Sequence, residues 1–252
     1  MTNEAYRRAE EKIEAAFRGR ATQLNLTDWQ SEEKLTTLPP SLSRLTQLHT
    51  LEVSDNQLTS LPEWLSQLTQ LRLLDLTGNR LTYLPEWLGQ LPELQFLYVS
   101  GNRLTSLPQR LGQLTQLRKL YVSANRLTSL PKWLGQLTGL QELYVGNNQL
   151  TSLPDGMDQL TQLQELYLIS NQLTALPESL RQLRSLTALY LHGNRKLGLS
   201  ADILGPTYQE VRDGKSAADP QAILAFYFAQ QKQSAKPLNE VKLLLVGHGR
   251  VG

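Results

Sequence analysis

Residues 117–139 read LRKLYVSANRLTSLPKWLGQLTG, and the 23 residues that follow, LQELYVGNNQLTSLPDGMDQLTQ, repeat most of them in the same order. An asparagine marks the period, because it returns every 23 residues from Asn56 to Asn194. Six returns at one spacing indicate an array of stacked repeats, in which each unit packs only against its neighbours.

Each position of the repeat has an expected structural role. Leu120 and Val122 alternate with Tyr121, as in a short strand with one buried face. Asn125 should pair with backbone groups of the turn that would otherwise be buried without partners. Pro131 suits the first position of a helical turn, because its missing N–H would have no partner there. The pattern L-x-x-L-x-L/V-x-x-N-x-L is that of a leucine-rich repeat.

This pattern predicts an α/β repeat fold, a leucine-rich repeat solenoid with one strand, one turn and one short helical segment per repeat. Strands stack at about 4.8 Å, whereas helical segments are wider. The stack should therefore curve into a horseshoe, with short parallel strands on the concave face. We expect a capping helix in residues 1–22, repeats over 23–197, and a C-terminal cap and linker over 198–240.

Both ends of the array are expected to be closed by helices, because terminal repeats expose their leucines. The apolar residues near one face of the segment 4–18 are Tyr6, Ala9, Ile13, Ala16 and Phe17. A cap over the first repeat explains this face, and an amphipathic helix that binds a partner is the alternative. A second helix should begin at Pro220. Its apolar stripe consists of Ile223, Leu224, Tyr227 and Phe228.

Composition restricts the class of protein. The net charge of +2 is too small to indicate binding to nucleic acid. The N-terminus has no apolar run that would suit a signal peptide, and no segment approaches the length of a membrane span. The chain has no cysteine, which favours a reducing setting and hence a cytoplasmic location.

The final residues, 241–252, read VKLLLVGHGRVG and suggest a nucleotide-binding domain. An apolar run readable as a buried strand precedes two glycines that match those of the phosphate loop G-x-x-x-x-G-K-[ST]. The partial loop would consist of Gly247, His248, Gly249, Arg250, Val251 and Gly252. A tight turn is the alternative explanation of the glycines. We expect the loop's lysine and Ser/Thr to follow in a longer protein.

The order of these segments resembles that of bacterial Roco proteins. Repeats of the type N-R/Q-L-T-x-L-P are followed by ILGPTYQEV, by AILAFYF and by PLNEVKLLLVGHGRVG. The resemblance implies that residues 241–252 begin a Ras-like GTPase domain, called Roc, followed by a dimerising COR domain. It implies GTP or GDP with Mg²⁺ as ligands of the longer, homodimeric protein, and a kinase domain in some relatives. We expect no cofactor for the residues present here.

A column of aromatic residues on the concave face is the main candidate for binding protein. One strand position holds Tyr98, Tyr121, Tyr144, Tyr167 and Tyr190 in five consecutive repeats. Phe96 lies in the adjacent column, which continues with Lys119, Glu142 and Glu165. Aromatic rings are enriched at interfaces because they combine a large contact area with a polar tip. Stacking between strands is the alternative reason for the column.

A second column follows the asparagines and contains Arg80, Arg103 and Arg126. Three arginines in register could hold carboxylates or a phosphorylated partner. A solvated charged edge is the alternative.

The sequence contains no pattern typical of a catalytic or metal site. There is no cysteine nucleophile, the three histidines are far apart, and no metal-ligand spacing occurs. Two hypotheses remain. The repeats form a recognition and regulatory module that binds a separate protein or the GTPase and COR domains of its own parent. Alternatively, the parent is an enzyme, a GTPase, and the repeats serve mainly as its intramolecular regulator.

Overall fold

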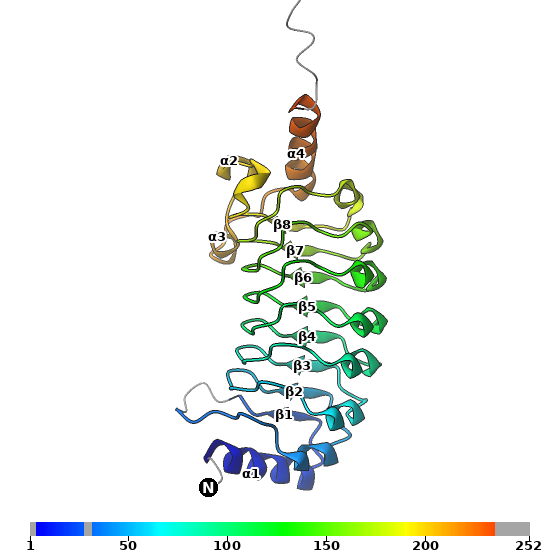
Figure 1. The fold of residues 1–252 in the computed structure, drawn as a ribbon, viewed down its shortest axis with the longest axis vertical. Helices are drawn as coiled ribbons and strands as arrows, with labels where there is room; N and C mark the ends of the chain where they lie inside the picture. The colour runs from blue at the N-terminus through cyan, green and yellow to red at the C-terminus, as the bar shows by residue number, and fades with distance from the viewer. Residues whose placement is uncertain (1–3, 28–31, 235–252) are drawn as a thin grey trace, which may run out of the picture.

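The computed structural model describes residues 4–27 and 32–234, which form one stack of repeats with a helix at each end (Figure 1). Eight parallel strands pair in sequence order within a single sheet, which confirms the predicted leucine-rich repeat solenoid. The strands are β1 (Gln23–Asn25), β2 (Thr50–Glu52), β3 (Leu73–Asp75), β4 (Phe96–Tyr98), β5 (Lys119–Tyr121), β6 (Glu142–Tyr144), β7 (Glu165–Tyr167) and β8 (Ala188–Tyr190).

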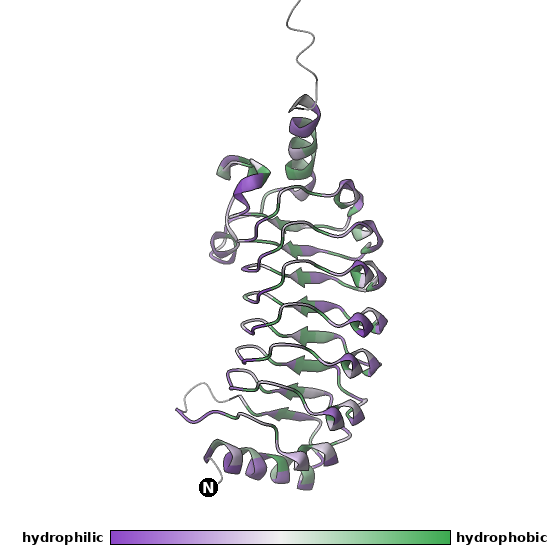
Figure 2. Ribbon diagram, in the orientation of Figure 1, coloured by the Kyte–Doolittle hydropathy of each residue, from purple (hydrophilic) through white to green (hydrophobic). Residues whose placement is uncertain are grey.

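One register holds throughout the sheet, because every strand pairs through the same positions of its repeat. Leu97, Leu120 and Leu143 lie opposite one another on β4, β5 and β6. These central residues point inward and are fully buried, while the residues before and after them face out of the sheet. We call this outer side of the sheet the strand face. Figure 2 shows hydrophobic residues along the strands and hydrophilic residues at the tips of the turns.

The recurring asparagine is buried and satisfies the backbone of the turn. The amide nitrogen of Asn125 donates to the carbonyl oxygens of Val99, Val122 and Ser123 at 3.0, 3.1 and 3.2 Å. Its Oδ1 accepts the N–H of Leu104 at 2.9 Å. Each asparagine therefore bonds to its own turn and to the preceding repeat, which confirms the predicted structural role.

The helical segments opposite the sheet are 3₁₀ helices, and five of the predicted prolines lie one residue earlier than expected, whereas Pro154 is separated from its helix by two residues. Pro62 and Pro131 precede their helices with extended backbone, at ψ 148° and 152°. The carbonyl oxygen of Pro131 accepts the N–H of Leu134, so the proline supplies the first acceptor of the turn. The segments are η1 (Pro40–Arg44), η2 (Glu63–Gln67), η3 (Glu86–Gln90), η4 (Gln109–Gln113), η5 (Lys132–Gln136), η6 (Met157–Gln159), η7 (Glu178–Gln182) and η8 (Arg195–Leu197).

Helix α1 (Glu4–Arg18) covers the first repeat, as predicted. Its buried residues are Ala5, Ala9, Ile13 and Ala16. The expected face is wrong at Phe17, which is 39% exposed and lies under the guanidinium group of Arg44 at 3.7 Å. The apolar face of α1 is used within the fold.

Between the last repeat and residue 234, where the described part ends, the chain forms three helices: α2 (Ala201–Leu204), α3 (Tyr208–Arg212) and α4 (Pro220–Ser234). Helix α4 begins at the predicted proline and closes the stack. Its four predicted apolar residues, Ile223, Leu224, Tyr227 and Phe228, are all buried. The predicted end of the linker and the partial phosphate loop, residues 235–252, lie outside the described residues.

Candidate functional site

The five aligned tyrosines form a continuous ladder of rings along the strand face. Ring centroids of neighbours are 4.7 Å apart between Tyr98 and Tyr121, and 4.2 Å apart between Tyr121 and Tyr144. The next two separations, to Tyr167 and then to Tyr190, are 5.3 and 5.7 Å. The parallel register creates the ladder, because identical positions of neighbouring strands lie opposite each other.

Two hydroxyl groups of the ladder are held by the adjacent acidic column. The phenol of Tyr121 donates to Glu142, and that of Tyr144 donates to Glu165, in each case one strand further along. Lys119 completes this network through an ion pair of 2.7 Å with Glu142. The tyrosines and their neighbours therefore hold each other in fixed orientations.

Burial raises the pKa of both Tyr121 and Tyr144, and the hydrogen bonds to Glu142 and Glu165 raise it further. Burial also raises the pKa of Tyr98, Tyr167 and Tyr190. The ladder is thus a surface of neutral phenols at physiological pH. Such a surface suits apolar and hydrogen-bonding contacts with a partner.

The chain itself covers the C-terminal part of the ladder. Tyr208 of α3 meets three rings edge-on, with centroid distances of 6.0 Å to Tyr144, 5.1 Å to Tyr167 and 5.4 Å to Tyr190. Tyr190 is consequently buried at 5% exposure, contrary to its predicted position on an open surface. Tyr98 has no such cover among the described residues.

Tyr208 is the main residue of this face that sequence reasoning missed. It stands at the first position of α3, directly after Thr207, and it has no counterpart in the repeats. One local signal was present, since Thr207 and Glu210 have the spacing of a capping box. The structure contains that capping box, and Lys215 bonds to Glu210 as well. The signal predicts the start of a helix but not which rings the helix covers.

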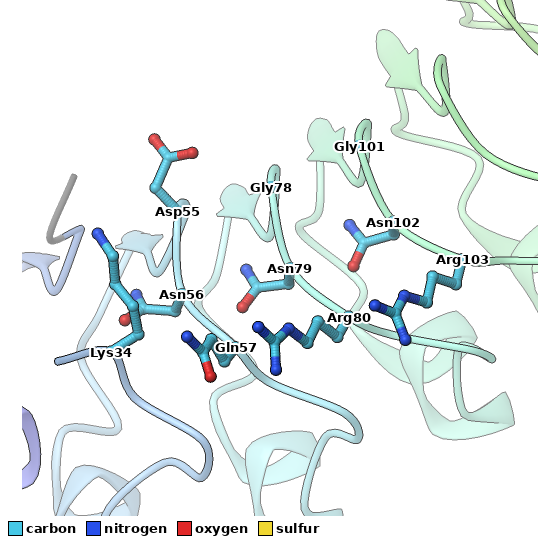
Figure 3. A pocket seen from close by; sticks show the side chains of 10 residues that line it. All are labelled: Lys34, Asp55, Asn56, Gln57, Gly78, Asn79, Arg80, Gly101, Asn102 and Arg103. Atoms are coloured by element: carbon cyan, nitrogen blue, oxygen red, sulfur yellow. The ribbon is translucent and has the colours of Figure 1, made fainter. Parts of the chain in front are cut away.

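The predicted arginine column lies beside the strand face, on the edge of the stack that the turns following the strands form. We call this edge the turn edge, and all three arginine side chains are exposed there. Arg80 and Arg103 line one open pocket together with Lys34 and Asp55 (Figure 3). Arg126 lies one repeat further along and is outside the lining of that pocket. Lys34 and Asp55 were not predicted, because neither belongs to the arginine column.

The remaining candidates from the sequence do not form a catalytic site in the described ranges. His192 is a structural residue, because its Nε2 lies 3.0 Å from the carbonyl oxygen of Gly205. Residues 4–27 and 32–234 contain no group of three His, Asp or Glu side chains suited to a metal ion. Within the same ranges, no helix is long and apolar enough to cross a membrane.

Two sequence families match the chain. The family described as "Leucine-rich repeat region" matches residues 63–148, and the family described as "Leucine rich repeat" matches residues 31–81 and 138–195. No curated protein matches the sequence.

Several solved structures are similar. A leucine-rich repeat protein of Leptospira interrogans is 33% identical, with a TM-score of 0.63 over 71% of this chain and 51% of that one. The functional domain of InlJ from Listeria monocytogenes is 27% identical, with a TM-score of 0.61 over 75% and 46% of the two chains. The ectodomain of the receptor kinase GASSHO1/SCHENGEN3 from Arabidopsis thaliana, in complex with CASPARIAN STRIP INTEGRITY FACTOR 2, is 35% identical, with a TM-score of 0.57 over 61% and 19%.

This chain thus spans about half or less of the length of each of those structures. Together the family matches cover strands β2 to β8 and the whole buried asparagine ladder from Asn56 to Asn194. The chain is a leucine-rich repeat protein.

Proposed function

We propose that this chain is a protein-recognition module and that its binding surface is the open part of the tyrosine ladder. The observation that carries the proposal is the contact of Tyr208 with three rungs. It is an example, within the chain, of an aromatic side chain bound edge-on by this surface. The similar ectodomain from Arabidopsis thaliana, which is solved in complex with another protein, supports the same use of the fold.

The rings of the ladder that are open to a partner are not the rings that the sequence predicts as binding hot spots. Central tyrosines would be the expected hot spots, but the edges of Tyr144 and Tyr167 are in contact with Tyr208. Tyr98 and Tyr121 are half-buried, lie beyond that contact, and adjoin Phe96 on β4. We therefore place the binding centre at Tyr98 and Tyr121.

The proposal can be tested with peptides selected from a random displayed library on the immobilised chain. We expect Tyr98→Ala to weaken the selected peptides at least tenfold, which is about 1.4 kcal/mol, because the ring supplies buried contact area. Tyr98 has a ladder ring on one side and makes no side-chain hydrogen bond with any described residue, so its removal should lower the melting temperature only slightly. Isothermal titration calorimetry measures the affinity.

Tyr83→Ala is the matched control, since Tyr83 is 53% exposed and lies outside the ladder. It should bind the same peptides normally. Equal binding by Tyr98→Ala, Tyr121→Ala and Tyr83→Ala would show that the ladder is architectural and that recognition occurs elsewhere.

We further propose that the module belongs to a Roco-type protein of the cytoplasm. The support is the resemblance of residues 198–252 to the segment that precedes and begins the Roc domain, together with the absence of cysteine in the chain. In such a parent the GTPase and COR domains are candidate partners of the repeats, with homodimerisation through COR. The contact of Tyr208 with the ladder supports an intramolecular role, because a segment of the chain already occupies this surface.

We expect residues 1–252 alone to bind no GTP at micromolar concentration. A phosphate loop acts through backbone N–H groups together with a lysine and a hydroxyl that binds Mg²⁺. Residues 247–252 supply only the first part of that motif. Calorimetric titration of the chain with GTP and Mg²⁺ measures this directly.

The proposed Roco-type parent would provide the positive control. Its sequence after Gly252 should continue with Lys and then Ser or Thr, and it should bind GTP. Micromolar binding by the 252-residue chain, or a different pair of residues after Gly252, would contradict the proposed parent.

A further inference from the structure

An open pocket of about 540 Å³ lies along the turn edge, where the turns after β2, β3 and β4 stack on one another (Figure 3). Its charged lining consists of three cations, Lys34, Arg80 and Arg103, and one carboxylate, Asp55. The ladder asparagines also line it, but their amides are occupied by the backbone. The two arginines are therefore the main groups left to meet a ligand.

The guanidinium groups of Arg80 and Arg103 make no hydrogen bond or ion pair with any residue in the described ranges. Figure 3 shows the two side chains leaving neighbouring turns in the same direction along the stack. Adjacent rungs are about 4.8 Å apart. At this spacing both groups can donate to one oxyanion, and guanidinium geometry suits the oxygens of a carboxylate or phosphate.

The fold does not require a charge at this position of the repeat. Gln57, Gln149 and Gln172 occupy the same position in other repeats and keep the same backbone contact to the preceding repeat. Two like charges one rung apart repel each other, and a bound anion would remove that repulsion. A ligand explains the pair of arginines better than a structural role does.

We propose that this pocket is an oxyanion-binding site, which takes a carboxylate or phosphate group carried by a protein partner. Arg80 and Arg103 bind the oxygens, and Lys34 adds positive charge at the rim. Asp55 lines the same pocket and opposes binding through its negative charge alone, because Figure 3 shows its carboxylate turned away from the two guanidinium groups. The site is separate from the strand face, so it adds a charged anchor beside the tyrosine ladder.

Three short peptides of one neutral sequence, with glutamate, phosphoserine or serine at the centre, distinguish the two sources of the oxyanion. Titration at low salt should show saturable binding of a charged peptide and none of the serine peptide. Stronger binding of the phosphoserine peptide identifies phosphate as the ligand group, stronger binding of the glutamate peptide identifies carboxylate, and equal binding of the two shows a general oxyanion site. R80Q/R103Q should weaken the charged peptide at least tenfold, and glutamine already occurs at this position in other repeats.

R72Q/R118Q is the matched control. It removes the same charge from two exposed arginines outside the pocket, where glutamine occurs at the same repeat position in Gln95 and Gln141. Its affinity for the charged peptide should stay within about twofold of that of the unsubstituted chain. Equal losses in the two double variants, or equal binding of the serine peptide, would overturn the site.

Asp55→Asn is an independent variant that should change the affinity for the charged peptide in the opposite direction. Asn147 occupies the equivalent position with φ 52°, close to the φ of 53° at Asp55, so asparagine fits the backbone there. Removal of the carboxylate should tighten the charged peptide several-fold, and weaker binding would contradict the proposal. The tyrosine ladder is unchanged in all these variants, so failure here is distinguishable from failure of the proposed recognition face.

Discussion

Asn125→Ala should lower the free energy of unfolding by about 1–3 kcal/mol, and the upper end is expected because several buried groups lose a partner together. The carbonyl oxygens of Val99 and Val122 and the N–H of Leu104 all bond to this one side chain. Asn125 is only 8% exposed, so water has little access to replace it. Urea denaturation followed by circular dichroism measures the change.

Gln149→Ala is the control, because Gln149 is an exposed amide side chain beside the next asparagine of the ladder. We expect it to change the free energy of unfolding by less than about 0.5 kcal/mol, as is usual for surface positions. An unchanged midpoint for Asn125→Ala would show that the ladder does not stabilise the turns.

The period of the sequence predicts the sheet well, because one strand position repeated every 23 residues leaves a single in-register pairing. Leu120 and Leu143 are opposite each other for that reason. The detailed form of the helical segments was less predictable. Prolines such as Pro62 and Pro131 precede their 3₁₀ helices and accept the first hydrogen bond of the turn through their carbonyl groups. The missing N–H of proline suits this preceding position as well as it suits the first helical position, so the sequence alone does not decide between the two.

The sequence predicts which residues of the candidate site align in columns, but it does not predict which of them are accessible to a partner. Register aligns the tyrosines, so the ladder could be inferred from spacing alone. Its cover could not, since Tyr208 belongs to a segment without the repeat and reaches the ladder through tertiary packing. The same limit applies to Lys34 and Asp55, which join Arg80 only through the stacking of different turns.

Tyr227→Ala should lower the free energy of unfolding by about 3–5 kcal/mol, because it removes a buried aromatic ring from the end of the stack. This is the largest effect that we expect in this chain. Tyr227 is 2% exposed and packs against Phe228, with ring centroids 5.0 Å apart. Its hydroxyl accepts the N–H of Leu176 at 3.1 Å. The variant therefore removes both apolar contact and the partner of a buried N–H group.

Two further variants separate these contributions. Tyr227→Phe keeps the ring and leaves the N–H of Leu176 without its partner, so it should lower the free energy of unfolding by about 1–3 kcal/mol. Phe226→Ala removes a neighbouring ring that is 44% exposed on the same helix, and its effect should be much smaller. Hydrogen exchange at Leu176 should accelerate in both Tyr227 variants and stay slow in Phe226→Ala. If Tyr227→Ala and Phe226→Ala lowered stability equally, helix α4 would not be the cap that holds the last repeats closed, because repeats unfold from an uncapped end.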